Sequence, residues 1–377
     1  MRKISILFSV IILGFSSCSQ DDSIDQVEIE TTGIQPENTN IKGFYLLNEG
    51  NMGTNRASID FLDYEKGQYQ RNIYATANPT IVKELGDVGN DIKIYGNRLY
   101  AVINVSNYIE VMDAKTAKHI GSIPVNNVRY ITFDKGKAYA SSYAGPVEIS
   151  ENAPIGKVVE IDTASLAITR EVTVGYQPDE LVVVGNKLFV ANSGGYRVPN
   201  YDKTVSVVDL ASFKEEKKID VAINLHHIKK DQENDLYVSS RGDYYNIPSN
   251  LFVLDSKTHQ IKKNFNIPVT NFTIVDDFLY YYANEFNYNT YKWTRSYGVI
   301  NTKTEEIVNQ YLIKDPIIDK IKTPYGIAVN PTTKDIYLTD AGDYVSTGYV
   351  YAFDKNGKFK WKVAAGNIPA HFVFLYK

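Results

Sequence analysis

The chain has 377 residues and a formal net charge of −4, and it contains no run of basic residues. A nucleic-acid partner is therefore not expected, because a surface that binds a phosphate backbone carries concentrated positive charge. Tyrosine is abundant, with 29 residues against three methionines and two tryptophans. Its flat ring and polar tip suit both β-strands and ligand-binding surfaces.

The N-terminus has the pattern of a secreted lipoprotein. Arg2 and Lys3 precede an apolar run from Ile4 to Phe15, which is typical of a secretory leader and too short to span a bilayer as a stable helix. Two serines follow, and then Cys18, the one cysteine of the chain. This order resembles a bacterial lipobox, in which the cysteine thiol is lipidated and becomes the first residue of the mature protein.

A polar segment follows the cysteine. Its first residues, Ser-Gln-Asp-Asp at 19–22, are similar to the acidic export tag that sends lipoproteins of Bacteroides-type bacteria to the cell surface. Residues 23–40 are polar and acidic and contain Gly33 and Pro36, a composition typical of a flexible tether. We therefore expect a lipoprotein signal peptide at 1–17, a lipidated tether at 18–40 that anchors the protein to the outer membrane at the cell surface, and a folded domain at 41–377.

A strand pattern repeats along the folded domain. Between Leu181 and Asp209, two apolar runs flank the dipeptide Gly185-Asn186, which is typical of a β-hairpin, and a third apolar run completes a meander. Further copies of the pattern begin near Ile92, Ile131, Ile228, Phe272 and Ile327.

The third strand of each copy ends on an acidic or amide residue that precedes a turn. These residues lie about 50 residues apart, a period typical of a β-propeller, whose blades bury their faces by closing into a ring. They are Asp63, Asp113, Asp162, Asp209, Asp255, Asn301 and Asp354. The seven copies predict an all-β fold, a seven-bladed β-propeller with four-stranded antiparallel blades.

The first copy supplies only three strands, because it opens near Gly43 and no inner strand precedes it. The C-terminal residues 371–377 follow Ile368-Pro369 in the way that each inner strand follows the preceding blade. We expect this C-terminal strand to become the inner strand of the first blade. It would close the ring and remove an exposed sheet edge.

The connections between second and third strands are long, whereas turns on the opposite face, such as Gly96-Asn97, are tight. Function concentrates in loops that a rigid frame holds, so we predict that a ligand binds on the long-loop face. Its connections are 48–58, 141–157, 192–204, 239–250, 284–296 and 340–348, with a short one at 104–107.

Aromatic residues alternate with Arg, Asn and Gly in these loops, which suits a wall that stacks on a large ligand and binds its polar groups. The alternative is that the rings pack loop against loop. The predicted wall consists of Tyr143, Tyr196, Arg197, Arg241, Tyr244, Tyr245, Phe286, Tyr288, Trp293 and Tyr344. The residues around the start of the inner strands should surround the channel mouth, and the predicted floor consists of Arg129, Tyr130, Glu180, His227, Tyr325 and His371.

A catalytic or metal centre is not expected. Acids, amides and imidazoles at the channel mouth could hold a metal ion, but they come from different blades without a reinforcing pair spacing. His226 and His227 are adjacent and would not both face inward on a regular strand. The chain also lacks a Gly-x-Ser-x-Gly motif, a phosphate-binding Gly-rich loop and a His-x-x-x-His pair. We therefore predict a binding protein without a metal site rather than an enzyme.

Several sequence phrases resemble known propellers. NKLFVAN at 186–192, TVSVVD at 204–209 and the prolines before several inner strands resemble the YVTN and YncE-type seven-bladed propellers. The opening FYLLNEGNMGTNRASIDF at 44–61, together with the lipoprotein leader and the Tyr-rich and Asn-rich loops, is similar to the BtuG group of Bacteroides-type surface lipoproteins.

This resemblance implies a ligand and a partner. The ligand is cobalamin, that is vitamin B12 and related corrinoids, bound without a further cofactor, and the partner is a TonB-dependent vitamin B12 transporter in the outer membrane. Cobalamin is broad and largely neutral with a rim of amides, which a wide face of Tyr, Asn and Arg would suit. Two other classes stay open: a surface module that binds a glycan or a protein, and a propeller lyase or lactonase with a divalent ion at the channel mouth.

Overall fold

The computed structural model describes residues 29–31, 33, 39–80, 84–309 and 312–377. The expected signal peptide, Cys18 and most of the expected tether lie outside these residues. Within the described ranges, no helix is long and apolar enough to cross a membrane.

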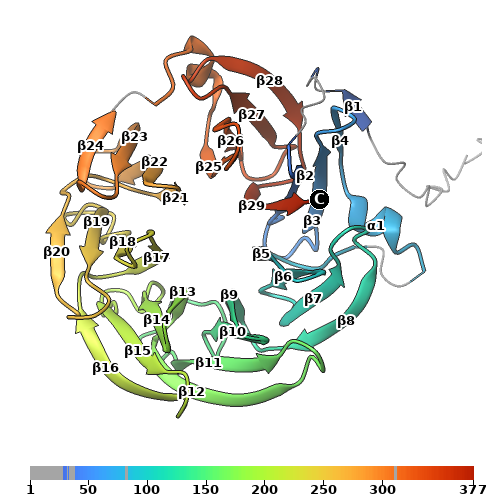
Figure 1. Cartoon of the computed structure of the whole chain (residues 1–377). Helices are drawn as coiled ribbons and strands as arrows, with labels where there is room; N and C mark the ends of the chain where they lie inside the picture. Colours follow the sequence, from blue (N-terminus) through green and yellow to red (C-terminus); the bar gives the residue numbers. More distant parts are fainter. Residues whose placement is uncertain (1–28, 32, 34–38, 81–83, 310–311) are drawn as a thin grey trace, which may run out of the picture.

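The described residues form seven antiparallel sheets, arranged as blades around a central axis (Figure 1). The prediction of an all-β, seven-bladed propeller is therefore confirmed. From inner to outer strand, blade 1 consists of β29 (Pro369–Tyr376), β2 (Ile41–Asn48), β3 (Ser58–Asp63) and β4 (Gln68–Gln70). Blade 2 consists of β5 (Gly89–Tyr95), β6 (Arg98–Ile103), β7 (Tyr108–Asp113) and β8 (His119–Pro124). Blade 3 consists of β9 (Val128–Asp134), β10 (Lys137–Ser142), β11 (Ile155–Asp162) and β12 (Ile168–Tyr176).

The same order holds in the other blades, where each inner strand comes first in the chain. Blade 4 consists of β13 (Pro178–Val184), β14 (Lys187–Asn192), β15 (Thr204–Asp209) and β16 (Lys214–Asp220), and blade 5 of β17 (Leu225–Lys230), β18 (Leu236–Ser240), β19 (Asn250–Leu254) and β20 (Ile261–Asn264). Blade 6 consists of β21 (Asn271–Val275), β22 (Phe278–Asn287), β23 (Lys292–Asn301) and β24 (Glu306–Asn309), and blade 7 of β25 (Pro324–Val329), β26 (Ile336–Asp340), β27 (Tyr349–Phe353) and β28 (Phe359–Ala364). Two short helices, α1 (Ile73–Ala77) and the 3-10 helix η1 (Pro316–Lys320), lie in connections between blades.

The inner strand of blade 1 is the C-terminal strand β29, which Figure 1 shows in red beside β2. The two strands pair antiparallel, with Phe44 opposite Phe374 and Leu46 opposite Phe372. This pairing joins the two ends of the folded chain and removes an unpaired inner edge. The predicted closure of the ring is thus confirmed.

A fifth strand, β1 (Ile29–Thr31), lies at the outer edge of blade 1 and pairs with β4, where Ile29 is opposite Gln70. It falls within the segment 18–40 that we expected to be a tether, so sheet pairing begins before residue 41. Its three residues are too few to show a strand period in a polar sequence.

Neighbouring blades bury apolar side chains against each other. The cluster between blades 4 and 5 contains Phe189, Val207, Leu225 and Val238, which are at most 1% exposed. Burying one such side chain stabilises the fold by about 1.5–3 kcal/mol. The blades therefore form a rigid ring that positions the loops on its faces.

The seven repeat residues all act in turns. Asp255 Oδ1, for example, accepts hydrogen bonds from the backbone N–H groups of Lys257 at 2.7 Å and Thr258 at 2.8 Å. The other six side chains likewise accept from a backbone N–H group two or three residues later. An acid or amide recurs at this place because its side-chain oxygen satisfies donors that the turn leaves unpaired.

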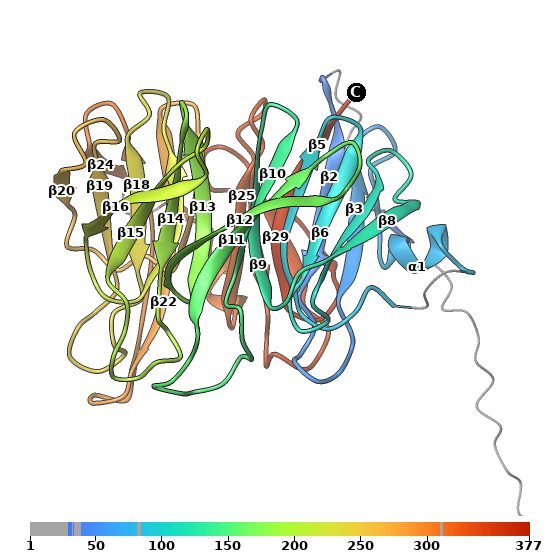
Figure 2. The same cartoon turned by 90° about the horizontal axis from the view of Figure 1, so that it is seen from below.

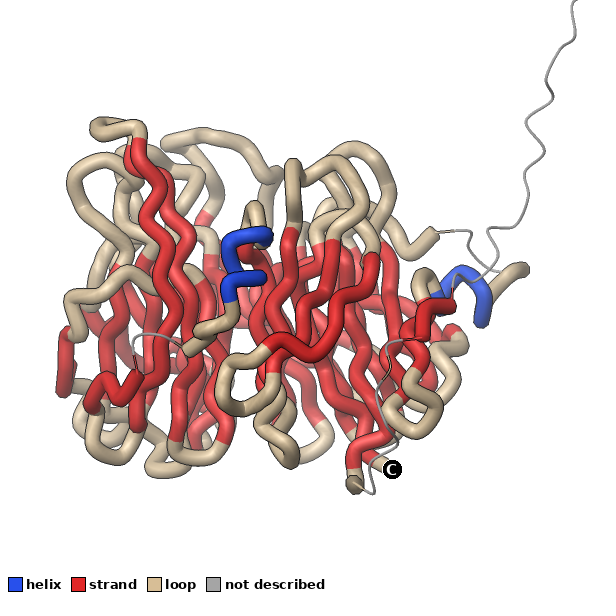
Figure 3. Tube along the Cα trace, turned by 90° about the horizontal axis from the view of Figure 1, so that it is seen from above, coloured by secondary structure: helices blue, strands red, loops and turns tan. Residues whose placement is uncertain are grey.

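Side views show the disc with connecting loops on both of its faces (Figures 2 and 3). The segment 284–296, predicted to be a loop, is instead mostly the extended end of the β22–β23 hairpin, where Phe286 is opposite Trp293. Its tip is a tight turn in which Asn287 Oδ1 accepts hydrogen bonds from the N–H groups of Asn289 and Thr290. The alternation of aromatic and polar residues around this turn favours strand pairing over a loop.

Candidate functional site

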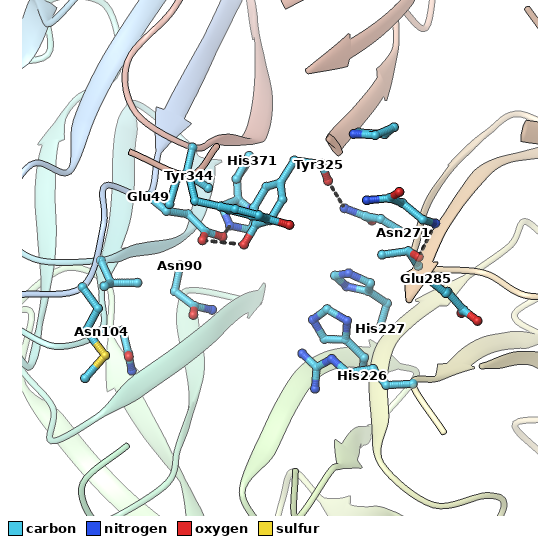
Figure 4. Close-up of a pocket in the computed structure, with 18 of the residues that line it drawn as sticks. Glu49, Asn90, Asn104, His226, His227, Asn271, Glu285, Tyr325, Tyr344 and His371 are labelled. Carbon is cyan, nitrogen blue, oxygen red and sulfur yellow. Dashed lines mark hydrogen bonds and ion pairs between the residues drawn. The ribbon is translucent and has the colours of Figure 1, made fainter. Parts of the chain in front are cut away.

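A cavity of about 630 Å³ lies at the long-loop end of the propeller axis, and all seven blades contribute to its lining. Figure 4 shows part of this lining. Sites for small molecules typically measure roughly 300–1,000 Å³. Residues near the start of the inner strands form the floor of the cavity, and the loops between second and third strands form its wall. The cavity is therefore the candidate functional site.

Most of the residues predicted from the sequence to form a site meet in this cavity. Its lining includes the predicted residues Arg129, Tyr130, Tyr196, His227, Arg241, Tyr244, Phe286, Tyr288, Trp293, Tyr325, Tyr344 and His371. The regular placement of each blade explains this, because equivalent positions in successive blades converge on the same axis.

Four other predicted residues lie outside the lining. The buried Tyr143 and Glu180 hold lining residues from behind, as described below. Arg197 stacks its guanidinium 3.6 Å from the centre of the Tyr176 ring. Tyr245 is exposed and packs on Tyr288 with 5.3 Å between ring centres.

Both histidines of the His226-His227 pair line the cavity, although only His227 was predicted to do so. Strand β17 has a register shift between Leu225 and Ile228, so the regular alternation of side chains is interrupted there. The two imidazole rings lie with their centres 3.7 Å apart (Figure 4). The expectation that the two side chains could not both face inward was wrong because it assumed a strand without a bulge.

Further polar residues on the lining were not among the predicted site residues. They include Glu49, Asn90, Asn104, Asn271 and Glu285 (Figure 4). Asn90 and Asn271 lie at the start of inner strands, a position that could have identified them. Glu285 lies in the hairpin that we expected to be a loop. There Asn284, Glu285 and Phe286 line the cavity in succession, so neither loop composition nor regular strand alternation singles out Glu285.

Glu49 organises one side of the cavity. Its carboxylate accepts a hydrogen bond of 2.8 Å from the Tyr325 hydroxyl and lies 3.0 Å from His371 Nε2 (Figure 4). Burial and the negative charge of Glu49 raise the pKa of Tyr325 well above its usual range, so this hydroxyl keeps its proton. The three side chains hold each other in place across blades 1 and 7.

Glu180 organises the floor beneath the histidines. It lies 2.9 Å from His227 Nδ1 and accepts a hydrogen bond of 2.9 Å from Lys229 Nζ. Although burial opposes ionisation, Lys229 and His227 hold the pKa of Glu180 well below its usual range. Burial and Lys229 together lower the pKa of His227 to about 4, so the imidazole is neutral at neutral pH.

His226 is also neutral at neutral pH. Its Nε2 lies 2.9 Å from the Tyr130 hydroxyl. Burial lowers the pKa of His226 well below its usual range, and the positive charges of Arg241 and Arg129 act in the same direction. The two histidines therefore contribute polar ring atoms to the cavity and no positive charge.

The two arginines of the lining converge on one buried acid, Asp179, which has no exposed surface. Asp179 Oδ1 accepts hydrogen bonds from Arg129 Nε at 3.4 Å and from the Tyr143 hydroxyl at 2.8 Å. Asp179 Oδ2 accepts one from Arg241 Nη1 at 2.9 Å. The Arg129 guanidinium also lies 4.6 Å from the centre of the Tyr143 ring.

An aromatic cluster on the β22–β23 hairpin forms one wall. Phe286 lies 5.3 Å from Trp293 and 5.0 Å from Tyr288, measured between ring centres. Trp293 is 53% exposed and Tyr288 is 50% exposed, although both are large and mostly apolar. Exposed aromatic surface beside a cavity is typical of a site that stacks on a flat ligand.

Glu285 is the acid of the lining whose pKa lies near neutrality, because burial raises the pKa of Glu285 to about 7. Between about pH 5 and pH 7, the folded state keeps a proton on this carboxyl that an unfolded glutamate has lost. Raising the pH through this window therefore favours unfolding. His227 has the opposite effect on stability. Between about pH 4 and pH 6.5 an unfolded histidine is protonated, whereas His227 in the folded protein is not, so raising the pH through this window favours folding.

A Glu285→Gln variant separates the two contributions, because glutamine is a neutral match for the protonated acid. We expect the variant to gain stability over the wild type as the pH rises from about 5 to about 7.5. Urea unfolding of both proteins at the two pH values measures this. A stability difference that does not change with pH would show that Glu285 is already ionised at pH 5.

Within the part of the chain that the structure describes, no group of three or more His, Cys, Asp or Glu side chains is placed to hold a metal ion.

The family of the chain is shown by its sequence. A family profile described as a domain of unknown function, DUF5074, matches residues 42–375. The chain belongs to the DUF5074 family. The match begins within β2 and ends within β29, so the DUF5074 domain corresponds to the closed propeller. No curated protein matches this DUF5074 chain at a significant level.

Solved structures similar to this DUF5074 protein include two propeller-like proteins. Hydrazine synthase of Kuenenia stuttgartiensis has a TM-score of 0.55 and 16% sequence identity, over 71% of this chain and 77% of that chain. A quinonprotein alcohol dehydrogenase-like protein from Bacteroides thetaiotaomicron has a TM-score of 0.55 and 14% identity, over 89% of this chain and 78% of that chain. At these identities the likeness shows the fold alone.

Proposed function

We propose that this DUF5074 protein is a lipid-anchored, surface-exposed binding protein that takes cobalamin and related corrinoids into its axial cavity and passes them to a TonB-dependent transporter in the outer membrane. The observation that carries the proposal is the cavity itself, which combines an exposed aromatic wall with a polar floor in a lining to which all seven blades contribute. The transporter and the anchoring rest on the resemblance to the BtuG group and on the leader that ends at Cys18.

The chemistry of cobalamin matches this combination. A corrinoid presents a flat conjugated ring and side chains that end in primary amides. The rings of Trp293 and Tyr288 offer apolar faces for stacking, and Asn90, Asn104 and Asn271 place amide groups on the lining. Cobalamin is also broader than the cavity, so part of it would lie above the floor and beside the exposed β22–β23 hairpin.

A binding role also agrees with the pairing of the acids and bases on the floor. Glu49 is held by Tyr325 and His371, and Glu180 is held by Lys229 and His227. These groups stabilise the cavity from within. We therefore assign the protein no catalytic step.

Isothermal titration of the purified protein with cyanocobalamin and with hydroxocobalamin tests the proposal. We expect one corrinoid to bind per chain and the protein to retain the red colour of the ligand after gel filtration. Absence of heat and of retained colour with both corrinoids would refute cobalamin binding and would favour a glycan or a protein as the ligand.

Fractionation of cells that produce the full chain tests the anchoring. The wild type is expected in the outer-membrane fraction and to be cleaved when whole cells are treated with protease, and Cys18→Ala is expected to leave the membrane fraction. Wild-type protein that resists protease while other surface proteins are degraded would show that it does not face outward.

A further inference from the structure

Arg129 and Arg241 form a pair of cationic side chains on the cavity lining. Arg129 lies on the floor of the cavity in blade 3, and Arg241 lies on its wall in blade 5. Both side chains contact the same acid, Asp179 of blade 4. Their side chains are 11% and 27% exposed, whereas the side chain of Asp179 has no exposed surface. The acid is thus behind the arginines, and the arginines face the cavity.

The two guanidinium groups have donors to spare. An arginine carries five N–H donors. Among the described residues, Asp179 is the only hydrogen-bond acceptor for either side chain, and each arginine donates one bond to it. The remaining donors are available to a group that enters the cavity.

The local charge is unbalanced by one unit. Arg129 and Arg241 carry two positive charges, and Asp179 carries one negative charge. The adjacent His226 and Tyr130 stay neutral, because burial lowers the pKa of His226 and raises the pKa of Tyr130. This corner of the cavity therefore suits a group with a single negative charge.

The geometry is also fixed in advance. The Tyr143 hydroxyl holds Asp179 in place, and the Tyr143 ring packs against the Arg129 guanidinium. Two planar guanidinium groups anchored on one buried carboxylate lose little conformational freedom when an anion binds. Arginine pairs of this kind bind phosphate and carboxylate oxygens through several charge-assisted hydrogen bonds.

We propose that Arg129 and Arg241 form a subsite for a monoanionic phosphodiester, with Asp179 as the residue that positions them. The identity of the ligand rests on the proposed function: in cobalamin the group would be the phosphodiester of the nucleotide loop. The subsite would then fix the orientation of the corrinoid, with the nucleotide loop toward blades 3 to 5. Glu49, on blade 1, is an acid of the lining and would repel the same group, which adds to the preference.

Cobinamide provides the test, because it keeps the corrin ring and its amides but lacks the nucleotide loop and the phosphodiester. We expect Arg241→Gln and Arg129→Gln each to weaken cobalamin binding by about tenfold or more, as loss of a charge-assisted hydrogen bond does, and to leave cobinamide binding unchanged. Arg197→Gln is the matched control, since it removes one positive charge from the same face outside the cavity lining. Circular dichroism confirms that each variant is folded.

Two results would overturn the subsite. One is an equal loss of affinity for cobalamin and cobinamide in the arginine variants, which would mean that the pair supports the cavity without contacting the anion. The other is unchanged cobalamin affinity. If Arg197→Gln weakened cobalamin as much as the other variants, the effect would be one of general charge and the subsite would also be refuted.

A second measurement separates the subsite from the proposed function. Dimethyl phosphate is titrated into the ¹⁵N-labelled wild type, and the arginine Nε–H resonances are followed by NMR. Saturable shifts of the Arg129 and Arg241 signals that disappear in Arg241→Gln would support the subsite even if no corrinoid bound. Wild-type signals that do not move would refute it, whatever the result with cobalamin.

Discussion

Removal of the C-terminal strand is expected to lower the melting temperature sharply and to broaden the transition. Deleting residues 371–377 takes away most of β29, so that Phe44 and Leu46 lose their cross-strand partners and β2 becomes an open edge. The deletion removes the buried Leu375, whose burial stabilises the fold by about 1.5–3 kcal/mol, together with the half-buried Phe372, Val373 and Phe374 and the main-chain pairing of β2. The free energy of unfolding of a typical domain is only about 5–15 kcal/mol. Thermal unfolding followed by circular dichroism measures the effect.

The outer edge of the same blade provides the control. A truncation that removes residues 1–31 takes away β1, which pairs with β4 through three residues at the rim of the ring. We expect a much smaller change in melting temperature, because the ring stays closed. If deletion of residues 371–377 left the melt unchanged, β29 would not be the strand that closes the propeller.

Trp293→Ala is expected to weaken cobalamin binding by more than tenfold. The indole lines the cavity and is supported by Phe286, so it offers a rigid face to a flat ligand. Truncation of an aromatic anchor at the centre of a binding site typically costs about 2 kcal/mol or more, and about 1.4 kcal/mol corresponds to tenfold in affinity. Calorimetric titration of the variant beside the wild type measures the change.

The same hairpin carries a matched control. Tyr291 is 78% exposed and also touches Phe286, with 6.2 Å between ring centres, but it does not line the cavity. We expect Tyr291→Ala to keep nearly full affinity, and Asn97→Ala and Asn186→Ala on the opposite face to have no effect. Loss of binding in the opposite-face variants, with Trp293→Ala unaffected, would mean that the ligand binds the other face.

The parts of the fold that could be predicted from the sequence are those that local chemistry decides. Asp255 and its six equivalents recur because each side chain satisfies backbone donors in its own turn. The period of these residues gives the number of blades, and the missing strand near Gly43 requires a partner from the C-terminus. None of these inferences needs knowledge of which distant side chains touch.

The candidate site could be predicted only by its position. Trp293, Tyr325 and His371 were expected near the mouth because equivalent positions in each blade converge on the axis. Tyr143 was expected on the wall as well, yet it lies buried behind Arg129. Loop composition shows which residue types gather on a face but does not show which of them face inward.

The sequence by itself determined the all-β class, the seven blades, the closing strand and the face with long loops, since period, turn residues and loop lengths are properties of neighbouring residues. Only the tertiary structure decided that a bulge in β17 turns both His226 and His227 into the cavity, and that Asp179 lies beneath Arg129 and Arg241. The bulge is a register shift of β17 against β18 of the same blade, which an expectation of regular strand alternation does not include, and the buried ion pair depends on contacts between blades about 50 residues apart in the chain. No period within a single blade records those contacts.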